Sequence, residues 1–210
     1  MLGHIANLWT YPFKSLRAME HAAVEVQADG IMGDREAALY VTTYGHPRAG
    51  KAYRGKEDNR LHLLFSGEAA LRAARERGVE LEVRAGERFF DAAAVSIVFD
   101  TWIAEGSRLA GAPLQPLRFR PNIFARAAKG FSEPEAALVG RRLRIGPCIL
   151  EVSATIKRCV TPTYDLESGS SNPHISRVIA QERDNVMGVY CSVREPGPLA
   201  IGDPIALTGS

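Results

Sequence analysis

The stretch RLRIGPCILEVSAT, residues 142–155, shows the pattern that decides the fold. Apolar and polar side chains alternate through RLRI, and CILEVSAT combines apolar, β-branched and small polar residues. Gly146 and Pro147 stand between the two halves, and turn residues of this kind bound strands. Such patterns over about four to eight residues are typical of half-buried strands. We therefore predict strands over 142–146 and 148–155.

Segments of the same type recur through the rest of the chain. Alternation, or β-branched and aromatic content, predicts further strands at HIANLWTYP (4–12), AAVEVQ (22–27), AALYVT (37–42), RLHLLF (60–65), VELEVR (79–84), GVYCSVR (188–194) and DPIALT (203–208). These strands outnumber the helical patterns and are not regularly interleaved with them, which argues against a doubly wound sheet. We expect a mainly β fold, a β-barrel with peripheral α-helices.

Two segments have the start and stop signals of helices. One runs from Ser66, a residue suited to the N-cap, to Gly78, a residue suited to the C-cap. The other begins at Asn172 and has Pro173 at the first helical position, where proline is favoured. A third helix is expected near 98–109.

The composition is that of an ordinary soluble globular protein. The 210 residues are 46% hydrophobic and 24% charged, which suits one domain of generous size or two small ones. The 26 basic and 24 acidic residues give a net charge of +2, so nucleic acid and anionic membrane are not expected as partners. The apolar run 92–99 is far shorter than the ~18 residues of a membrane helix, and no signal peptide is recognised. We expect a cytoplasmic protein.

The three cysteines, Cys148, Cys159 and Cys191, are an odd number without CxxC or CxxxC spacing. This argues against a disulfide framework and for a reducing compartment. It also argues against a cysteine-ligated iron–sulfur cluster, which needs four thiolates. Cys148 and Cys191 lie within apolar strand patterns, so we interpret them as packing residues.

Cys159 lies in a different environment, the segment IKRCVTPTYD (156–165). Lys157 and Arg158 come directly before it, and cationic neighbours favour the thiolate, the form that binds metals and attacks electrophiles. A thiolate suits molybdenum, copper, zinc or iron. The five histidines are scattered, so a zinc site has little support. A Cys–His nucleophile pair and a buried structural cysteine remain alternatives.

Two other short segments carry candidate anion-binding groups. In YPFKS (11–15) a strand ends and is followed by Lys14 and Ser15, which can hold a phosphate through an ammonium charge and a hydroxyl. In DGIMGDRE (29–36) two glycines and an Asp–Arg pair predict a tight turn that presents Arg35 to a phosphate. Taken singly, each segment also fits a solvated loop or a stabilised turn.

The segment LRFRPNIFA (117–125) holds two arginines and an amide at alternate positions. On a strand, Arg118, Arg120 and Asn122 would share one face and form a receptor for an anion with several donors. A strand that faces solvent would show the same alternation.

Taken together, these segments resemble the MOSC domain family, which includes the C-terminal domain of molybdenum cofactor sulfurase and the mitochondrial amidoxime-reducing component. The resemblance covers nearly the whole chain and rests on motifs that occur in the family's order: YPFKS, GDRE, RFRPNI, IKRCVTPTYDLESG and GVYCSVREPGPLAIGDPIAL. It implies a MOSC-type β-barrel in a single unit, 1–210. In this unit, 1–90 form a β-rich N-terminal part with YPFKS and GDRE, and 91–210 form the barrel core.

The resemblance also implies a molybdopterin-type molybdenum cofactor, with Cys159 as the ligand of the metal. By position, the cofactor-binding residues would be Lys14, Ser15, Arg35, Arg120 and Asn122, joined by Arg118, Arg158, Thr161 and Asp165. An anionic cofactor fits basic groups that converge from distant segments of a nearly neutral chain, and a metal ligand must be deprotonated.

The function implied is that of an oxidoreductase that reduces N-hydroxylated small molecules. We expect no flavin, iron–sulfur cluster or zinc, so a separate ferredoxin-like protein or flavoprotein reductase would supply the electrons. The long basic segment 43–59 is a candidate docking surface for that donor, or a merely solvated loop. One alternative is a non-catalytic carrier that holds the cofactor, or a persulfide on Cys159. Another is a barrel without cofactor that binds some other phosphorylated ligand.

Overall fold

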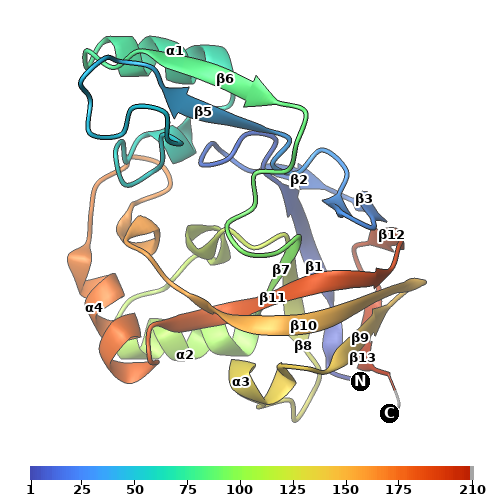
Figure 1. Cartoon of the computed structure of the whole chain (residues 1–210). Coiled ribbons are helices and arrows are strands. Elements are labelled where there is room, and N and C mark those ends of the chain that lie inside the picture. The colour runs from blue at the N-terminus through green and yellow to red at the C-terminus, as the bar shows by residue number, and fades with distance from the viewer. Residues whose placement is uncertain (209–210) are drawn as a thin grey trace.

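The computed structural model describes residues 1–208, and its largest element is a closed β-barrel (Figure 1). Seven strands form the barrel in the order β13-β9-β10-β11-β7-β8-β1, and a further pairing of β13 with β1 closes it. Neighbours are antiparallel except β7 and β8, which are parallel. The barrel strands are β1 (Gly3–Thr10), β7 (Val95–Phe99), β8 (Ile123–Ala127), β9 (Arg142–Ile145), β10 (Cys148–Lys157), β11 (Val186–Glu195) and β13 (Pro204–Leu207).

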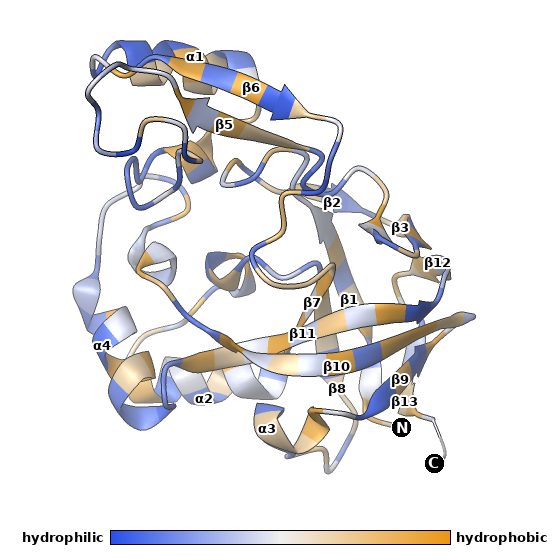
Figure 2. Cartoon of the chain, viewed as in Figure 1, coloured by the Kyte–Doolittle hydropathy of each residue, from blue (hydrophilic) through white to orange (hydrophobic). Residues whose placement is uncertain are grey.

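The inside of the barrel is a continuous apolar core. Fully buried side chains from successive strands fill it, among them Ile5, Ile97, Ile123, Leu150 and Val189. Figure 2 shows hydrophobic and polar bands that alternate along β10 and β11, as expected where one face of a strand points inward. Removal of this apolar surface from water is the dominant force that stabilises the barrel.

A second, smaller apolar core lies outside the barrel, at the top of Figure 1. There α1 (Gly67–Arg75) packs on the two-stranded sheet of β5 (Ala37–Val41) and β6 (Leu81–Ala85). Leu39 and Ala70 are fully buried between them. The chain thus has two hydrophobic centres, and the first strand of the sequence, β1, belongs to the barrel.

Two longer helices cover one side of the barrel and pack on each other: α2 (Asp100–Ala110) and α4 (Pro173–Glu182). Gly106 permits the close approach of α2 to the barrel strand β11, because a Cβ there would lie 2.8 Å from Cε of Met187. The remaining elements are β2 (Met19–His21) beside β1, the small sheet of β3 (Ala23–Gln27), β4 (Gly30–Ile31) and β12 (Gly197–Ala200), the helix α3 (Glu135–Leu138), and the 3-10 turns η1 (Leu61–Leu63), η2 (Pro116–Phe119) and η3 (Thr161–Thr163).

The predicted fold class, mainly β with peripheral helices, is confirmed. Apart from 60–65 and the first part of LRFRPNIFA, the predicted strands correspond to observed ones, and the three predicted helices are α1, α4 and α2. Ser66 and Asn172 cap their helices by accepting hydrogen bonds from backbone N–H groups. The first helix ends earlier than predicted, with Glu76 at the C-cap, and Gly78 follows in a left-handed conformation. No helix within residues 1–208 is long and apolar enough to cross a membrane.

Two strand predictions are wrong. Residues 60–65 contain η1, whose backbone hydrogen bonds stay within the turn and do not join a partner strand. In LRFRPNIFA, η2 comes first, Arg120 adopts a left-handed conformation, and β8 begins only at Ile123. The predicted common face of Arg118, Arg120 and Asn122 on one strand therefore does not form. Short apolar alternation cannot distinguish a strand from a turn whose apolar residues anchor it to a core.

Candidate functional site

A cavity of about 280 Å³ has walls from the barrel and from the segments around the smaller core, and we call it the cationic cavity. It joins segments that are far apart in the sequence: the loop after β1, the turn before β5, residues 118–120 and the end of β10. The residues that line it are Lys14, Ser15, Arg35, Arg54, Gly55, Lys56, His62, Asp91, Ser96, Arg118, Phe119, Arg120, Ile156, Lys157, Arg158, Cys159, Thr161, Pro162 and Tyr190.

The charge of this wall is strongly one-sided. Its cationic side chains are Lys14, Arg35, Arg54, Lys56, Arg118, Arg120, Lys157 and Arg158. Asp91 is the single carboxylate among the lining residues, and it pairs with the ammonium of Lys14 at 2.7 Å. A concave surface lined by one sign of charge concentrates ligands of the opposite sign. The cavity is therefore suited to an anion.

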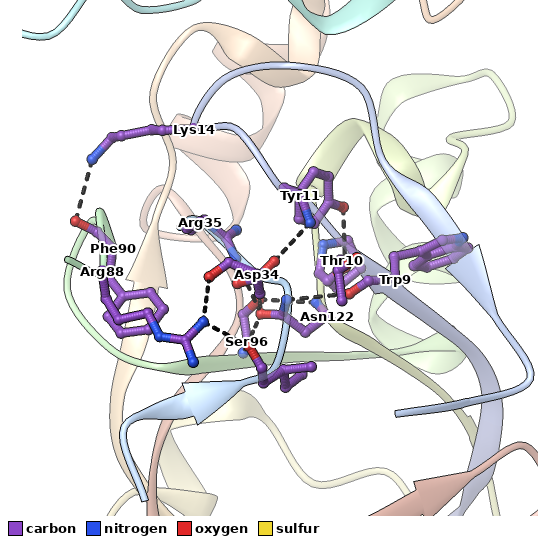
Figure 3. Close-up of polar contacts among 12 residues, drawn as sticks. Trp9, Thr10, Tyr11, Lys14, Asp34, Arg35, Arg88, Phe90, Ser96 and Asn122 are labelled. Carbon is purple, nitrogen blue, oxygen red and sulfur yellow. Dashed lines mark hydrogen bonds and ion pairs between the residues drawn. The ribbon is translucent and has the colours of Figure 1, made fainter. Parts of the chain in front are cut away.

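Arg35 is held in place by a buried carboxylate. Asp34, which is fully buried, accepts hydrogen bonds from the backbone N–H of Tyr11 at 2.7 Å and from Nη1 of Arg35 at 2.5 Å, as Figure 3 shows. Burial lowers the pKa of Arg35, but the charge of Asp34, the smaller contributions of Tyr11 and Asp91 and the hydrogen bond to Asp34 together outweigh burial and raise it. Arg35 thus stays fully charged while its position is fixed.

Arg120 has no such partner. Its guanidinium lies 4.1 Å from the centroid of the Tyr11 ring, and the guanidinium of Arg35 lies 4.8 Å from the same centroid. Among residues 1–208 no carboxylate pairs with Arg120, and its side chain donates no hydrogen bond. Burial lowers the pKa of Arg120, and the neighbouring Arg35 lowers it further. A cation that lines a cavity without a counterion is the most direct sign of an anionic ligand.

Strained backbone is concentrated at the same cavity. Ser15, Arg35 and Arg120 have φ values of 74°, 51° and 49°, in the left-handed region that non-glycine residues rarely adopt. All three line the cationic cavity. Each such residue costs on the order of 1–3 kcal/mol, and such strain is typical of ligand-binding segments.

Arg118 and Arg158 brace the loop that carries the cysteine. Arg118 donates to the carbonyl of Tyr164 at 2.6 Å and to the carboxylate of Asp165 at 3.0 Å. Arg158 donates to the carbonyl oxygens of Met187 and Phe119, each at 2.7 Å. Burial lowers the pKa of Arg158 to about 10, so the guanidinium is still a cation at neutral pH. Both arginines therefore contribute charge to the wall and fix its shape.

Cys159 is the exposed thiol of this protein. It lies between β10 and η3, lines the cavity, and its Sγ lies 3.2 Å from Oγ1 of Thr161. Cys148 and Cys191 are buried, and burial raises the pKa of Cys148 to about 11 and that of Cys191 still further. Of these thiols, Cys159 is the one that a ligand in the cavity can reach. Within residues 1–208 no group of three or more His, Cys, Asp or Glu side chains is arranged to hold a metal ion.

Two predicted site residues lie outside the cavity wall. Asn122 is buried, accepts hydrogen bonds from the backbone N–H and hydroxyl of Ser96 at 3.1 and 3.0 Å, and donates to the carbonyl of Trp9 at 3.2 Å (Figure 3). Its Oδ1 is also 3.4 Å from Nη1 of Arg35. Asp165 binds Arg118 from outside the wall. Each of them instead contacts an arginine that lines the cavity: Asn122 contacts Arg35, and Asp165 contacts Arg118.

Sequence reasoning missed several residues of the wall. The segment Arg54–Lys56 of the basic loop reaches the cavity, where Arg54 is held by three hydrogen bonds to Glu57. His62 was placed in a predicted strand but lies in η1 and reaches the wall from there. Tyr190 of β11 also lines the cavity. The basic composition of the loop was the one available signal for Arg54–Lys56. No local signal marks His62 or Tyr190, because their positions at the wall depend on tertiary contacts.

Comparisons with known proteins agree with this architecture. The family model of the MOSC domain matches residues 83–206. The crystal structure of the YuaD protein from Bacillus subtilis is similar, with a TM-score of 0.59, 18% sequence identity, and coverage of 98% of this chain and 94% of that chain. That of YiiM from Escherichia coli is similar with a TM-score of 0.51, 12% identity, and coverage of 100% and 71%. No curated protein matches the sequence.

The match begins at residue 83, so Lys14 and Arg35 enter the site from outside the matched segment, whereas Arg120 and Cys159 lie within it. At these identities the similar structures support the fold, and the family model supports membership. The chain belongs to the MOSC domain family.

Proposed function

We propose that this chain binds a molybdenum cofactor in the cationic cavity and reduces N-hydroxylated compounds with electrons from a separate donor protein. The MOSC family is associated with binding of this cofactor. The observation that supports the proposal most strongly is Arg120, a cation at the cavity wall with no counterion among residues 1–208. A desolvated charge is costly unless a ligand compensates it.

The residues present fit an anionic cofactor. Lys14, Ser15, Arg35 and Arg120 would hold its phosphate and the polar edge of its pterin, because guanidinium groups bind such oxygens through paired N–H donors. Cys159 would be the ligand of the metal, since its thiol is accessible at the same wall. When bound, the cofactor would supply a metal centre that changes oxidation state during reduction.

The chain's own groups have separate tasks in this scheme. Asp34 keeps Arg35 charged and fixed in advance of binding, so no reorganisation is needed when the anion arrives. Once the thiol of Cys159 is deprotonated, the hydroxyl of Thr161 can donate to the sulfur. Burial raises the pKa of Tyr190, so its Oη holds a proton at neutral pH beside the cavity. Tyr190 is therefore a candidate hydrogen-bond donor to a bound substrate.

A carrier function is the second candidate, and the exposure of Cys159 favours it. A thiol at an open wall can hold the cofactor, or a persulfide sulfur, for delivery to another protein. A carrier would bind the cofactor without catalytic turnover, which separates the two functions experimentally.

The test begins with protein purified from two bacterial hosts, one able and one unable to make molybdopterin. We expect molybdenum and a pterin in the first preparation, and reduction of benzamidoxime when a chemically reduced dye supplies electrons. Molybdenum without turnover would favour the carrier. Equal absence of molybdenum and pterin from both preparations would exclude the proposed cofactor.

A further inference from the structure

A second cavity of about 270 Å³ lies beside the first, and its wall is mostly apolar. We call it the apolar cavity. Trp9 and Tyr11 come from β1 and the residue after it, and Leu117 comes from η2. Phe65 and Leu166 complete the apolar wall. The polar residues of the same wall are Arg17, Glu20, His62, Arg118, Arg120 and Thr161.

The two cavities meet near the cysteine. His62, Arg118, Arg120 and Thr161 line both of them. Thr161 is also the residue whose Oγ1 lies 3.2 Å from Sγ of Cys159. A molecule in the apolar cavity can therefore extend past Thr161 toward the thiol.

The size and chemistry of the apolar cavity favour a ring system. Its volume is slightly below the range of about 300–1,000 Å³ that is usual for drug-sized ligands, which suits one or two rings. Phe65 is 70% exposed at the wall, and the guanidinium of Arg17 lies 4.6 Å from its ring centroid. Aromatic side chains prefer to pack on flat apolar groups.

His62 adds one polar feature at the shared wall. Its Nε2 lies 2.9 Å from the carbonyl oxygen of Asp165, which can only accept, so Nε2 carries the proton. Burial lowers the pKa of His62, as do the nearby Arg120 and Arg118, so the ring is neutral at pH 7. Nδ1 is then an acceptor, and it has no partner among the described residues.

We propose that the apolar cavity binds the organic part of the substrate, a neutral planar aromatic group of one or two rings whose N–OH end points past Thr161 toward Cys159. The reaction rests on the proposed function: the N–O bond breaks, two electrons come from the donor protein, two protons are taken up, and the products are the N–H compound and water. The binding site itself rests only on the wall described above.

The first measurement is binding, which needs no turnover. Benzamide, a planar compound without an N–OH group, is titrated into the protein while tryptophan fluorescence is followed. Trp9 lines the apolar cavity, and the other tryptophan, Trp102, does not. We expect a saturable change that the variant Ala18→Phe abolishes, because Ala18 lines the apolar cavity and the larger side chain fills it. Ala28→Phe, at an exposed turn residue, is the matched control and should bind as the wild type does. Circular dichroism verifies that both variants fold.

The second measurement compares substrates with and without a ring. Phe65→Ala should raise KM for benzamidoxime about fivefold, through lost apolar contact area, and should leave hydroxylamine reduction unchanged. Tyr44→Ala removes a still more exposed aromatic ring outside both cavities and should change the reduction of neither substrate.

Wild-type benzamide binding by Ala18→Phe, or an equal effect of Phe65→Ala on both substrates, would overturn the inference. If benzamide binds and Ala18→Phe abolishes binding while no preparation reduces benzamidoxime, the aromatic site stands and the proposed reaction fails.

Discussion

The inside of the barrel is filled by apolar side chains of regular strands, whereas the cationic cavity is lined mainly by residues of loops and 3-10 turns, three of them in left-handed conformations, and by many cationic side chains. The core contains fully buried residues such as Phe99 and Ile97. The cavity wall contains Arg120, which is destabilising where it stands unless an anion binds. We therefore expect substitutions in the barrel core to change mainly the free energy of unfolding. Substitutions in the wall of the cationic cavity should change mainly ligand affinity.

The largest expected effect is the complete loss of molybdenum and turnover in Cys159→Ser, because a hydroxyl cannot replace a thiolate as a soft ligand. Metal analysis and dye-linked reduction of benzamidoxime measure it. Cys148→Ser and Cys191→Ser change buried thiols and are the controls; they should lower stability and leave molybdenum per folded protein unchanged. Equal metal loss in all three folded variants would contradict the assignment.

Phe99→Ala tests the opposite region. The Phe99 ring is fully buried, with its centroid 4.6 Å from that of Phe131, so truncation should lower the free energy of unfolding by about 3–5 kcal/mol. Urea denaturation measures the change. Phe65→Ala removes an exposed ring and should cost less than about 0.5 kcal/mol. Similar decreases in the free energy of unfolding for Phe99→Ala and Phe65→Ala would contradict this difference between the barrel core and the cavity wall.

Arg120→Ala should weaken cofactor binding and spare the fold. Loss of a charge-assisted contact costs about 1.5–3 kcal/mol, or roughly tenfold to a hundredfold in affinity. Cofactor-free protein should melt at or slightly above the wild-type temperature, because an uncompensated cation is removed. Arg126→Ala, at an exposed position on β8, is the matched control for arginine loss. Early melting of Arg120→Ala without cofactor would make this arginine structural.

Asp165 gives a pH-dependent test of the loop that Arg118 braces. Hydrogen bonds from the backbone N–H groups of Ser168 and Glu167, then from the Ser168 hydroxyl, lower the pKa of Asp165 to about 2. A depressed pKa in the folded state stabilises it above the unfolded value near 4, and this contribution disappears as the pH falls toward 2. The stability advantage of the wild type over Asp165→Asn should therefore vanish across that window. A pKa near 4 in an NMR titration would contradict the prediction.

The smallest expected effect concerns the electron donor. NADPH alone should not drive reduction, whereas a ferredoxin with its reductase should, at a rate that falls as salt rises. Lys51 and Lys56 are the exposed cations of the basic loop, since Arg48 and Arg54 pair with Glu57. Lys51→Glu should slow donor-driven turnover a few-fold and leave dye-driven turnover unchanged, because Lys51 lies outside the cationic cavity. NADPH-driven reduction by the chain alone, or equal slowing with the dye, would refute this docking surface.

Much of the barrel could be predicted because its strands carry local signals. Alternation identified β9, β10, β11 and β13, and capping residues identified the starts of α1 and α4. The strand predicted at LRFRPN is wrong, because its alternation of apolar and polar residues is equally compatible with a turn. There Pro121 and the buried amide of Asn122, bonded to Ser96 and Trp9, fix the chain. Those partners lie on other strands, and local sequence gives no sign of them.

The sequence by itself determined the strand periodicity, the cationic segments around Lys14, Arg35 and Arg120, and the unusual setting of Cys159. Only the tertiary structure decided that Asp34 holds one arginine while the other lacks a counterion, and that an apolar cavity adjoins the thiol. The physical reason is distance along the chain. Periodicity and capping act over a few residues, whereas a charge's partner, or its lack of one, depends on which remote segments the closed barrel brings together.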